Sequence, residues 1–176
     1  PVRQIIHLGA VRYDLDRGEM WRGEAPVRLT ATEAPLMRIF AADGIKVLPG
    51  DLVCFRTGFD EEIFALNKKP TDRLHKVCTG LDGSDPKLLQ WVTESRVSAL
   101  ISDNYAVEVH NAPLKPGQCA ALPLHQHCLF KTGVNLGEIW RLSELADWLR
   151  SNNRSRFLLT APPLNLPGAV GSPANA

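Results

Sequence analysis

Short apolar runs alternate along this chain with stretches that have the apolar spacing of helices. Buried strands are predicted at residues 52–56, 97–101 and 157–161, because each is a short apolar run bounded by turn residues. A further strand is predicted at residues 5–11, followed by a charged, glycine-containing loop at 14–24. Strands at this spacing, separated by helices, indicate an α/β protein.

Helices are predicted from apolar periodicity and from cap residues, at 30–43, 59–67, 143–149 and from Asp85 onward. Asp85 stands at the cap position of the last of these, and Pro86 follows at the first helical position, where its missing N–H costs little. Together the elements predict a mixed β-sheet core flanked by helices. Residues 1–176 are expected to form one domain, because this length suits a single hydrophobic core.

Composition narrows the possible partners. The apolar fraction is 44%, the charged fraction is 22%, and 20 basic residues against 19 acidic ones leave a formal net charge of +1. This balance gives no electrostatic field that favours binding to nucleic acid or to an anionic membrane. No apolar run has the length of a membrane span. We therefore expect a cytoplasmic protein that acts on a small-molecule substrate, without a nucleic-acid or membrane partner. The four cysteines (Cys54, Cys78, Cys119 and Cys128) form no CxxC pair and are expected to be reduced thiols.

The densest chemistry lies in one stretch, where His125, Gln126 and His127 are followed by Glu138. Imidazole nitrogens and carboxylate oxygens are ordinary ligands of Zn²⁺ and Mn²⁺, and an amide oxygen can serve a hard divalent cation. Each of these residues also has an ordinary structural explanation. His125 could be a polar residue at a helix start, His127 a core histidine that donates to a carboxylate, and Glu138 half of a structural ion pair.

Three other polar residues are weaker candidates. Asp103 is predicted at the C-terminal end of a strand, where α/β proteins often place functional groups, although a plain cap or turn role also fits. Glu108 and His110 could line the mouth of a site, but alternation on an exposed strand explains them equally. A serine-hydrolase elbow and a phosphate-binding P-loop are both absent from the 176 residues.

An ordered series of motifs extends this picture. Pro49-Gly50-Asp51 leads into Arg56-Thr57-Gly58, Gly133 to Glu138 follows the histidines, and Ala161-Pro162-Pro163-Leu164 precedes Gly171-Ser172-Pro173-Ala174-Asn175-Ala176. The series resembles the cyclase family of metal-dependent hydrolases, which includes kynurenine formamidase, isatin hydrolase and trans-dienelactone hydrolase. The resemblance covers roughly residues 30 to 176.

The resemblance implies hydrolysis of a small amide, lactam or lactone, with a divalent Mn²⁺ or Zn²⁺ that polarises the scissile carbonyl and activates water. In kynurenine formamidase-like proteins a late histidine lies twelve residues before a glutamate, and counting back from Glu138 reaches Gln126. A one-residue offset would place either His125 or His127 at this position instead. Gln126, His125 and Glu138 are therefore the candidate metal ligands, and Glu138 and His127 the candidate catalytic residues. The family also implies a homodimer or a larger homo-oligomer.

One departure from the family leaves two hypotheses open. Family members carry an upstream His-x-Gly-Thr-His-x-Asp motif that supplies most of the metal ligands, and the 176 residues contain no such string. We expect the chain to be incomplete at both ends relative to the family. The alternative is a non-catalytic homologue with a structural or binding role that has lost the metal motif.

Overall fold

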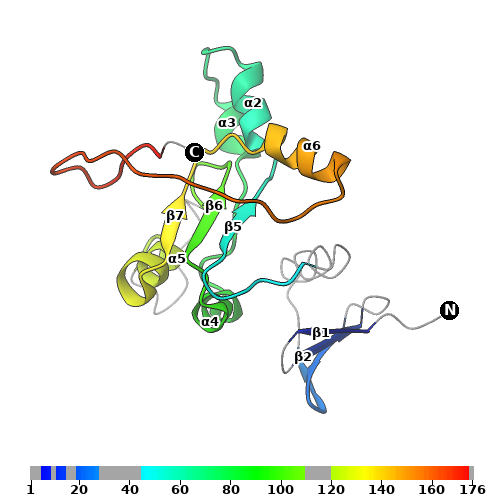
Figure 1. The fold of residues 1–176 in the computed structure, drawn as a ribbon. Helices are drawn as coiled ribbons and strands as arrows, with labels where there is room; N and C mark the ends of the chain where they lie inside the picture. The colour runs from blue at the N-terminus through cyan, green and yellow to red at the C-terminus, as the bar shows by residue number, and fades with distance from the viewer. Residues whose placement is uncertain (1–4, 9–10, 15–18, 28–44, 110–119, 175–176) are drawn as a thin grey trace.

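The strands among the described residues form two separate sheets. The structure, a computed structural model, describes residues 5–8, 11–14, 19–27, 45–109 and 120–174 (Figure 1). The first sheet is antiparallel and follows the chain in the order β1-β2-β3-β4. Its strands are β1 (Ile5–Leu8), β2 (Val11–Asp14), β3 (Glu19–Arg22) and β4 (Ala25–Val27).

The second sheet is parallel and has the order β5-β6-β7. Its strands are β5 (Leu52–Phe55), β6 (Ala99–Ser102) and β7 (Asn135–Gly137). Helical segments connect or follow these strands, as expected for parallel pairing. They are α2 (Phe59–Ala65), α3 (Arg73–Val77), α4 (Pro86–Ser95), α5 (Pro123–His125), the π-helix η1 (Gln126–Thr132) and α6 (Ser143–Ser151).

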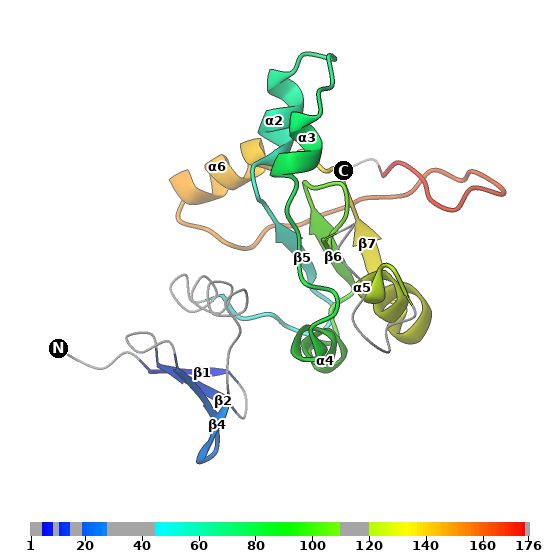
Figure 2. The same ribbon diagram turned by 180° about the vertical axis from the view of Figure 1, so that it is seen from behind.

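The core lies where β5 and β6 pack against α4 and η1. β6 is buried along its whole length, and Leu100 is fully enclosed. The core cluster joins residues from the strands, the helices and the loops between them: Val53, Val92, Val97, Leu100, Val107, Leu124, Cys128 and Val134. An extended segment after α6 crosses one face of the parallel sheet, and the chain between α3 and α4 runs along the other (Figures 1 and 2).

Several predicted elements are confirmed. β5 occupies the predicted strand at 52–56, and β6 overlaps the one predicted at 97–101. α2, α4 and α6 form where helices were predicted. The side chain of Asp85 accepts a hydrogen bond from Lys87 N at 2.9 Å, so the predicted cap of α4 is present. The α/β character of the chain is therefore correct.

Two local predictions are wrong. The predicted loop at 14–24 contains β3, in which Met20 pairs with Tyr13 of β2. Antiparallel strands commonly carry polar residues at alternate positions, so the charges there did not exclude pairing. The predicted strand at 157–161 is extended but has no strand assignment, and Leu158 is 92% exposed. An apolar run becomes a strand only where a neighbouring backbone completes its hydrogen bonds.

The predicted mixed sheet is also replaced by a different arrangement. The described strands that pair parallel and those that pair antiparallel belong to different sheets. The predicted helix at 30–43 lies outside the described residues, as do His110 and Cys119. Cys54, Cys78 and Cys128 are free thiols, and burial raises the pKa of both Cys54 and Cys128 to about 11.

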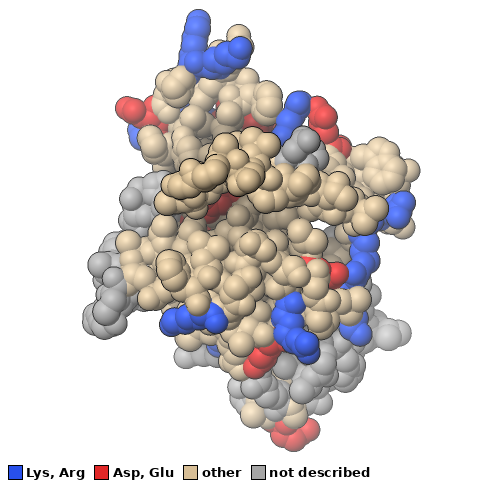
Figure 3. Space-filling view, turned by 60° about the vertical axis from the view of Figure 1, so that its left-hand side comes forward, with Lys and Arg blue, Asp and Glu red and all other residues tan. Residues whose placement is uncertain are grey.

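Charge is scattered over the surface. Figure 3 shows basic and acidic groups dispersed on one face among wide areas of uncharged surface. Among the described residues, no helix is both long enough and apolar enough to cross a membrane.

Candidate active site

Polar side chains gather in the loops that follow the parallel strands. Thr57 and Gly58 come after β5, Asp103 and Asn104 after β6, and Glu138 directly after β7. The carboxyl ends of parallel strands meet at the same edge of a sheet, which is where α/β proteins bind ligands. The fold therefore brings three loops together that are far apart in the sequence.

A chain of three ionisable side chains is the most distinctive feature of this region. His125 lies between two carboxylates: its Nδ1 is 2.7 Å from Glu108 Oε1, and its Nε2 is 3.1 Å from Glu138 Oε1. Glu138 Oε1 also accepts a hydrogen bond from Val107 N at 3.0 Å. The imidazole is thereby fixed on both edges, and the carboxylate of Glu138 is fixed from two directions.

Glu108 is the buried member of these three ionisable side chains, with 2% of its surface exposed. Its carboxylate accepts from Leu124 N at 3.0 Å and from His125 N at 2.7 Å, in addition to the imidazole. Two of these donors are the first backbone N–H groups of α5, which have no partner within the helix. Glu108 thus satisfies the helix start and orients the His125 ring at the same time.

Two glycines make room for Glu108. A Cβ on Gly83 would overlap Oε2 of Glu108, and a Cβ on Gly80 would lie 2.6 Å from the Glu108 backbone carbonyl carbon. The neighbouring Leu81 holds this segment in place, since its N donates to Val107 O at 3.0 Å and its O accepts from Val109 N at 2.9 Å. The close approach at residues 80–83 is therefore what lets a carboxylate be buried here.

The histidines stand at the junction of two helix types. α5 begins at Pro123 with Leu124 fully buried, and it continues into the seven-residue π-helix η1. π-Helices are rare and are frequent at functional sites. η1 ends at Gly133, whose φ of 70° suits a glycine, and Val134 then leads directly into β7 and Glu138.

The carboxylates change the acid–base behaviour of His125. Its hydrogen bond with Glu108, reinforced by the one with Glu138, raises the pKa of His125 to about 9, although burial acts in the opposite direction. At neutral pH the ring is therefore an imidazolium that donates both N–H groups to carboxylates. A cation that took the place of the Nε2 proton would meet one imidazole nitrogen and one carboxylate oxygen.

The predicted site residues separate into two groups. His125 and Glu138 come together, and Glu108 joins them, buried rather than on an exposed strand. Gln126 is exposed at the start of η1, and His127 Nε2 lies 2.8 Å from Thr93 Oγ1 on α4. The histidine that faces Glu138 is thus thirteen residues before it, one more than the spacing used in the prediction.

Two further buried acids hold the loops rather than meeting His125. The carboxylate of Asp103 accepts from the backbone N–H groups of Thr57, Gly58 and Phe59, at distances of 2.7–3.1 Å, and from the Thr57 hydroxyl at 2.8 Å. It closes the turn before α2, so the cap role considered for Asp103 is the one observed.

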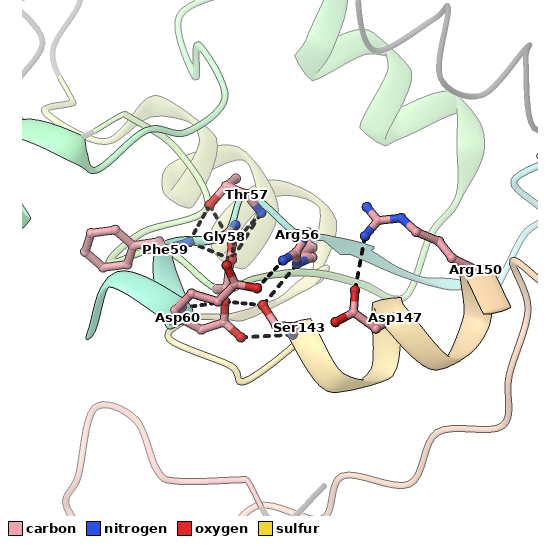
Figure 4. Close-up of polar contacts among 10 residues, drawn as sticks. Arg56, Thr57, Gly58, Phe59, Asp60, Ser143, Asp147 and Arg150 are labelled. Atoms are coloured by element: carbon pink, nitrogen blue, oxygen red, sulfur yellow. Dashed lines mark hydrogen bonds and ion pairs between the residues drawn. The ribbon is translucent and has the colours of Figure 1, made fainter. Parts of the chain in front are cut away.

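Asp60 joins the start of α2 to the start of α6. It accepts from Ser143 N at 2.9 Å and from Ser143 Oγ at 2.7 Å, while Arg56 Nε donates to the same hydroxyl at 3.0 Å (Figure 4). Burial raises the pKa of Asp60, but the hydrogen bonds from Ser143 and Glu61 N, with the charge of Arg56, outweigh it and hold that pKa below its usual value.

The donor set fits part of a metal site. In metal-binding histidines the second ring nitrogen commonly donates to a carboxylate, which is the arrangement of Glu108 and His125. Glu138 supplies an oxygen next to the remaining nitrogen. Across the described ranges, however, no group of three or more His, Cys, Asp or Glu side chains is placed to hold a metal ion. The described residues therefore bring together one imidazole nitrogen and one carboxylate oxygen, which is fewer than the three protein ligands of an ordinary zinc enzyme site.

Comparison with solved structures shows that this chain is similar to a cyclase. No family model matches the chain. A crystal structure described as that of a novel cyclase superposes with a TM-score of 0.63 and 34% sequence identity, covering 81% of this chain and 44% of that one. The present chain therefore spans less than half the length of the cyclase that it resembles.

A second match concerns a shorter stretch. Protein PetR of Rhodobacter capsulatus is 65% identical over 43 residues, which are 24% of this chain and 18% of PetR. The cyclase match, by contrast, extends over most of the chain and agrees with the α/β architecture. Over most of its length, this chain is therefore similar in fold and in sequence to a cyclase.

Proposed function

We propose that this chain carries part of the active site of a metal-dependent hydrolase that acts on a small amide, lactam or lactone. The observation that carries the proposal is the pair formed by His125 Nε2 and Glu138 Oε1, 3.1 Å apart, with Glu108 on the other ring nitrogen. The similarity to a cyclase and the motif series from Pro49 to Ala176 support the same reaction class.

Each of the three hydrogen-bonded residues, Glu108, His125 and Glu138, has a separate part in this proposal. Glu108 holds the ring of His125 by accepting from Nδ1, so that Nε2 is the nitrogen left to face a cation. Glu138 and His125 would hold the metal, which when bound polarises a carbonyl and lowers the pKa of a bound water. Glu138 is partly open, with 30% of its side chain exposed, so its second oxygen has access to a proton of a substrate or of water.

The remaining ligands would have to come from elsewhere, because the upstream motif of the family is absent from the 176 residues. Two protein ligands make a weak site, since zinc sites of enzymes ordinarily have three. We therefore expect this chain, as purified, to contain well below one metal ion per molecule, and to bind added Zn²⁺ or Mn²⁺ weakly. A near-stoichiometric metal content by elemental analysis would contradict this expectation.

Glu138→Gln tests the proposal because it keeps the shape of the side chain and removes its charge. We expect Zn²⁺ affinity, measured by calorimetric titration, to fall roughly ten-fold or more, with the fold still cooperative. Where amide or lactone hydrolysis is detected with added metal, turnover should fall by about 10²-fold. Glu144→Gln on α6 is the matched control, because Glu144 is an exposed carboxylate paired with Arg141. Equal Zn²⁺ affinity in the two variants would show that Glu138 does not bind the metal.

The alternative function is a non-catalytic one. It is favoured by the observation that the described residues provide no group of three or more such ligands, and that His125 is already compensated by two carboxylates without a metal. Under this alternative Glu138→Gln lowers the melting temperature and leaves metal binding unchanged. Activity that persists after exhaustive chelation would likewise argue against a metal-dependent hydrolase.

A further inference from the structure

The backbone beside Glu138 is strained. Ile139 has a φ of 57°, in the left-handed region that β-branched residues rarely adopt, and the residue is 55% exposed. Such a conformation is energetically unfavourable and persists only where the surroundings enforce it. Burial of the Ile139 side chain does not account for the conformation, so the cause must lie in the backbone contacts.

Two hydrogen bonds, one to the last residue of β6 and one to the loop that follows it, enforce this conformation. Ile139 N donates to Asn104 O at 2.9 Å, and Trp140 N donates to Ser102 O at 3.1 Å. The end of β7 is therefore clamped against the end of β6 at the residue that follows Glu138.

Asn104 is held more firmly than a loop residue needs to be. It is fully buried, and its amide nitrogen donates to Thr57 Oγ1 at 2.6 Å while its amide oxygen accepts from Thr79 N at 3.2 Å. Its own N donates to Ser102 Oγ at 3.1 Å. The Asn104 side chain thus ties the turn after β5 to the loop after α3, and the Asn104 backbone carbonyl ties both to the strained turn after β7.

We propose that Asn104 is a positioning residue that, through Thr57 and the Ile139 backbone, aims the Glu138 carboxylate at His125. Asn104 makes no contact with His125 or Glu138 through its side chain in the described contacts, so it acts only through the backbone. The inference rests on the proposed function in so far as Glu138 serves a metal site, but the placement of Glu138 can be measured without metal.

The metal-free measurement is amide hydrogen exchange by NMR. Val107 N donates to Glu138 Oε1, whereas Leu124 N and His125 N donate to Glu108. If Asn104 positions Glu138, then Asn104→Ala should speed exchange at Val107 by about ten-fold or more and leave Leu124 and His125 near their original rates. Thr57→Val should do the same, and Thr57→Ser, which retains the hydroxyl, should restore protection.

The second measurement is the affinity for Co²⁺, followed by its visible spectrum. Asn104→Ala and Thr57→Val should lower it by about 10- to 100-fold, the usual effect of residues that orient ligands, while Thr57→Ser retains it. Val97→Ala, in the core, controls for general destabilisation. Wild-type protein that binds no Co²⁺ would defeat the proposed function, and Val107 exchange would still decide the role of Asn104. Exchange at Val107 that rises no more than at Leu124, in both Asn104→Ala and Thr57→Val, would overturn the inference.

Discussion

The two sheets of this protein are assembled by opposite means. In the β1–β4 sheet each strand pairs with its neighbour in sequence, so that Ile5 lies opposite Asp14 and Met20 opposite Val27. In the β5–β7 sheet Leu52 lies beside Ala99, and Ala99 beside Asn135, with helices in between. Local pairing forms readily but brings together only residues that were already close, whereas non-local pairing is slower to form. The second sheet is the one that can gather Thr57, Asn104 and Glu138 at one edge.

The comparison predicts that the two regions respond differently to an added methyl group, and this is the largest effect expected. Gly83→Ala places a Cβ against the buried carboxylate of Glu108, where neither can move without breaking hydrogen bonds. We expect a loss of about 3 kcal/mol or more in unfolding free energy by urea titration. Gly23→Ala, in the turn between β3 and β4, is the control. The φ of 61° at Gly23 is strained for alanine, but an added Cβ would meet nothing within 4 Å. This substitution should cost roughly 1 kcal/mol. Equal losses would show that the space around Glu108 is not limiting.

Removing the charge of Glu108 should have the next largest effect. Glu108→Gln keeps the size of the side chain but leaves His125 without its principal compensating charge, so the pKa of His125 should fall from about 9 toward its ordinary value. The unfolding free energy at pH 7 should drop by roughly 2–3 kcal/mol, as for a buried charged hydrogen bond. NMR titration of the imidazole measures the first quantity and urea unfolding the second. Glu94→Gln, at an exposed position of α4, should change neither. An unaltered His125 titration in Glu108→Gln would refute the assigned pairing.

The stability of the β5–β7 region should depend on pH through His125. The pKa of His125 is raised in the folded chain, so its contribution is complete below about pH 6.5 and is lost as the pH rises through about 9. With a chelator present, the unfolding free energy of the β5–β7 region, measured by urea titration, should therefore decline between pH 6.5 and about pH 9. The expected decline is on the order of 2 kcal/mol. Glu108→Gln should flatten this decline. A stability that rises over the same range would contradict the imidazolium.

The smallest effect is expected at a helix end. Asp85→Ala removes the acceptor of the Lys87 N–H at the start of α4 and should cost about 1 kcal/mol, whereas Asp85→Asn keeps an acceptor and should cost less. Thermal unfolding followed by circular dichroism measures both variants. If the two lose the same stability, the charge of Asp85 rather than the cap hydrogen bond is what matters.

Local signals predicted the elements better than the contacts between them. The Asp85-Pro86 pair located α4, and the apolar run near Leu52 located β5, because caps and short buried runs depend on nearby residues. The run at 157–161 had an equally good strand pattern and formed none. Strand pairing depends on a partner, and local sequence carries no information about where the partner is.

The sequence by itself determined which chemistry is available: imidazoles and an amide in one segment, a carboxylate at Glu138 and others scattered elsewhere. Only the tertiary structure decided that His125 faces Glu138 while Gln126 is exposed and His127 meets Thr93. Successive residues of a helix project in directions roughly 100° apart, so a spacing in sequence that is wrong by one residue selects a different side of the helix. The burial of Glu108 depended in the same way on Gly80 and Gly83, whose close approach is set by packing against a distant segment.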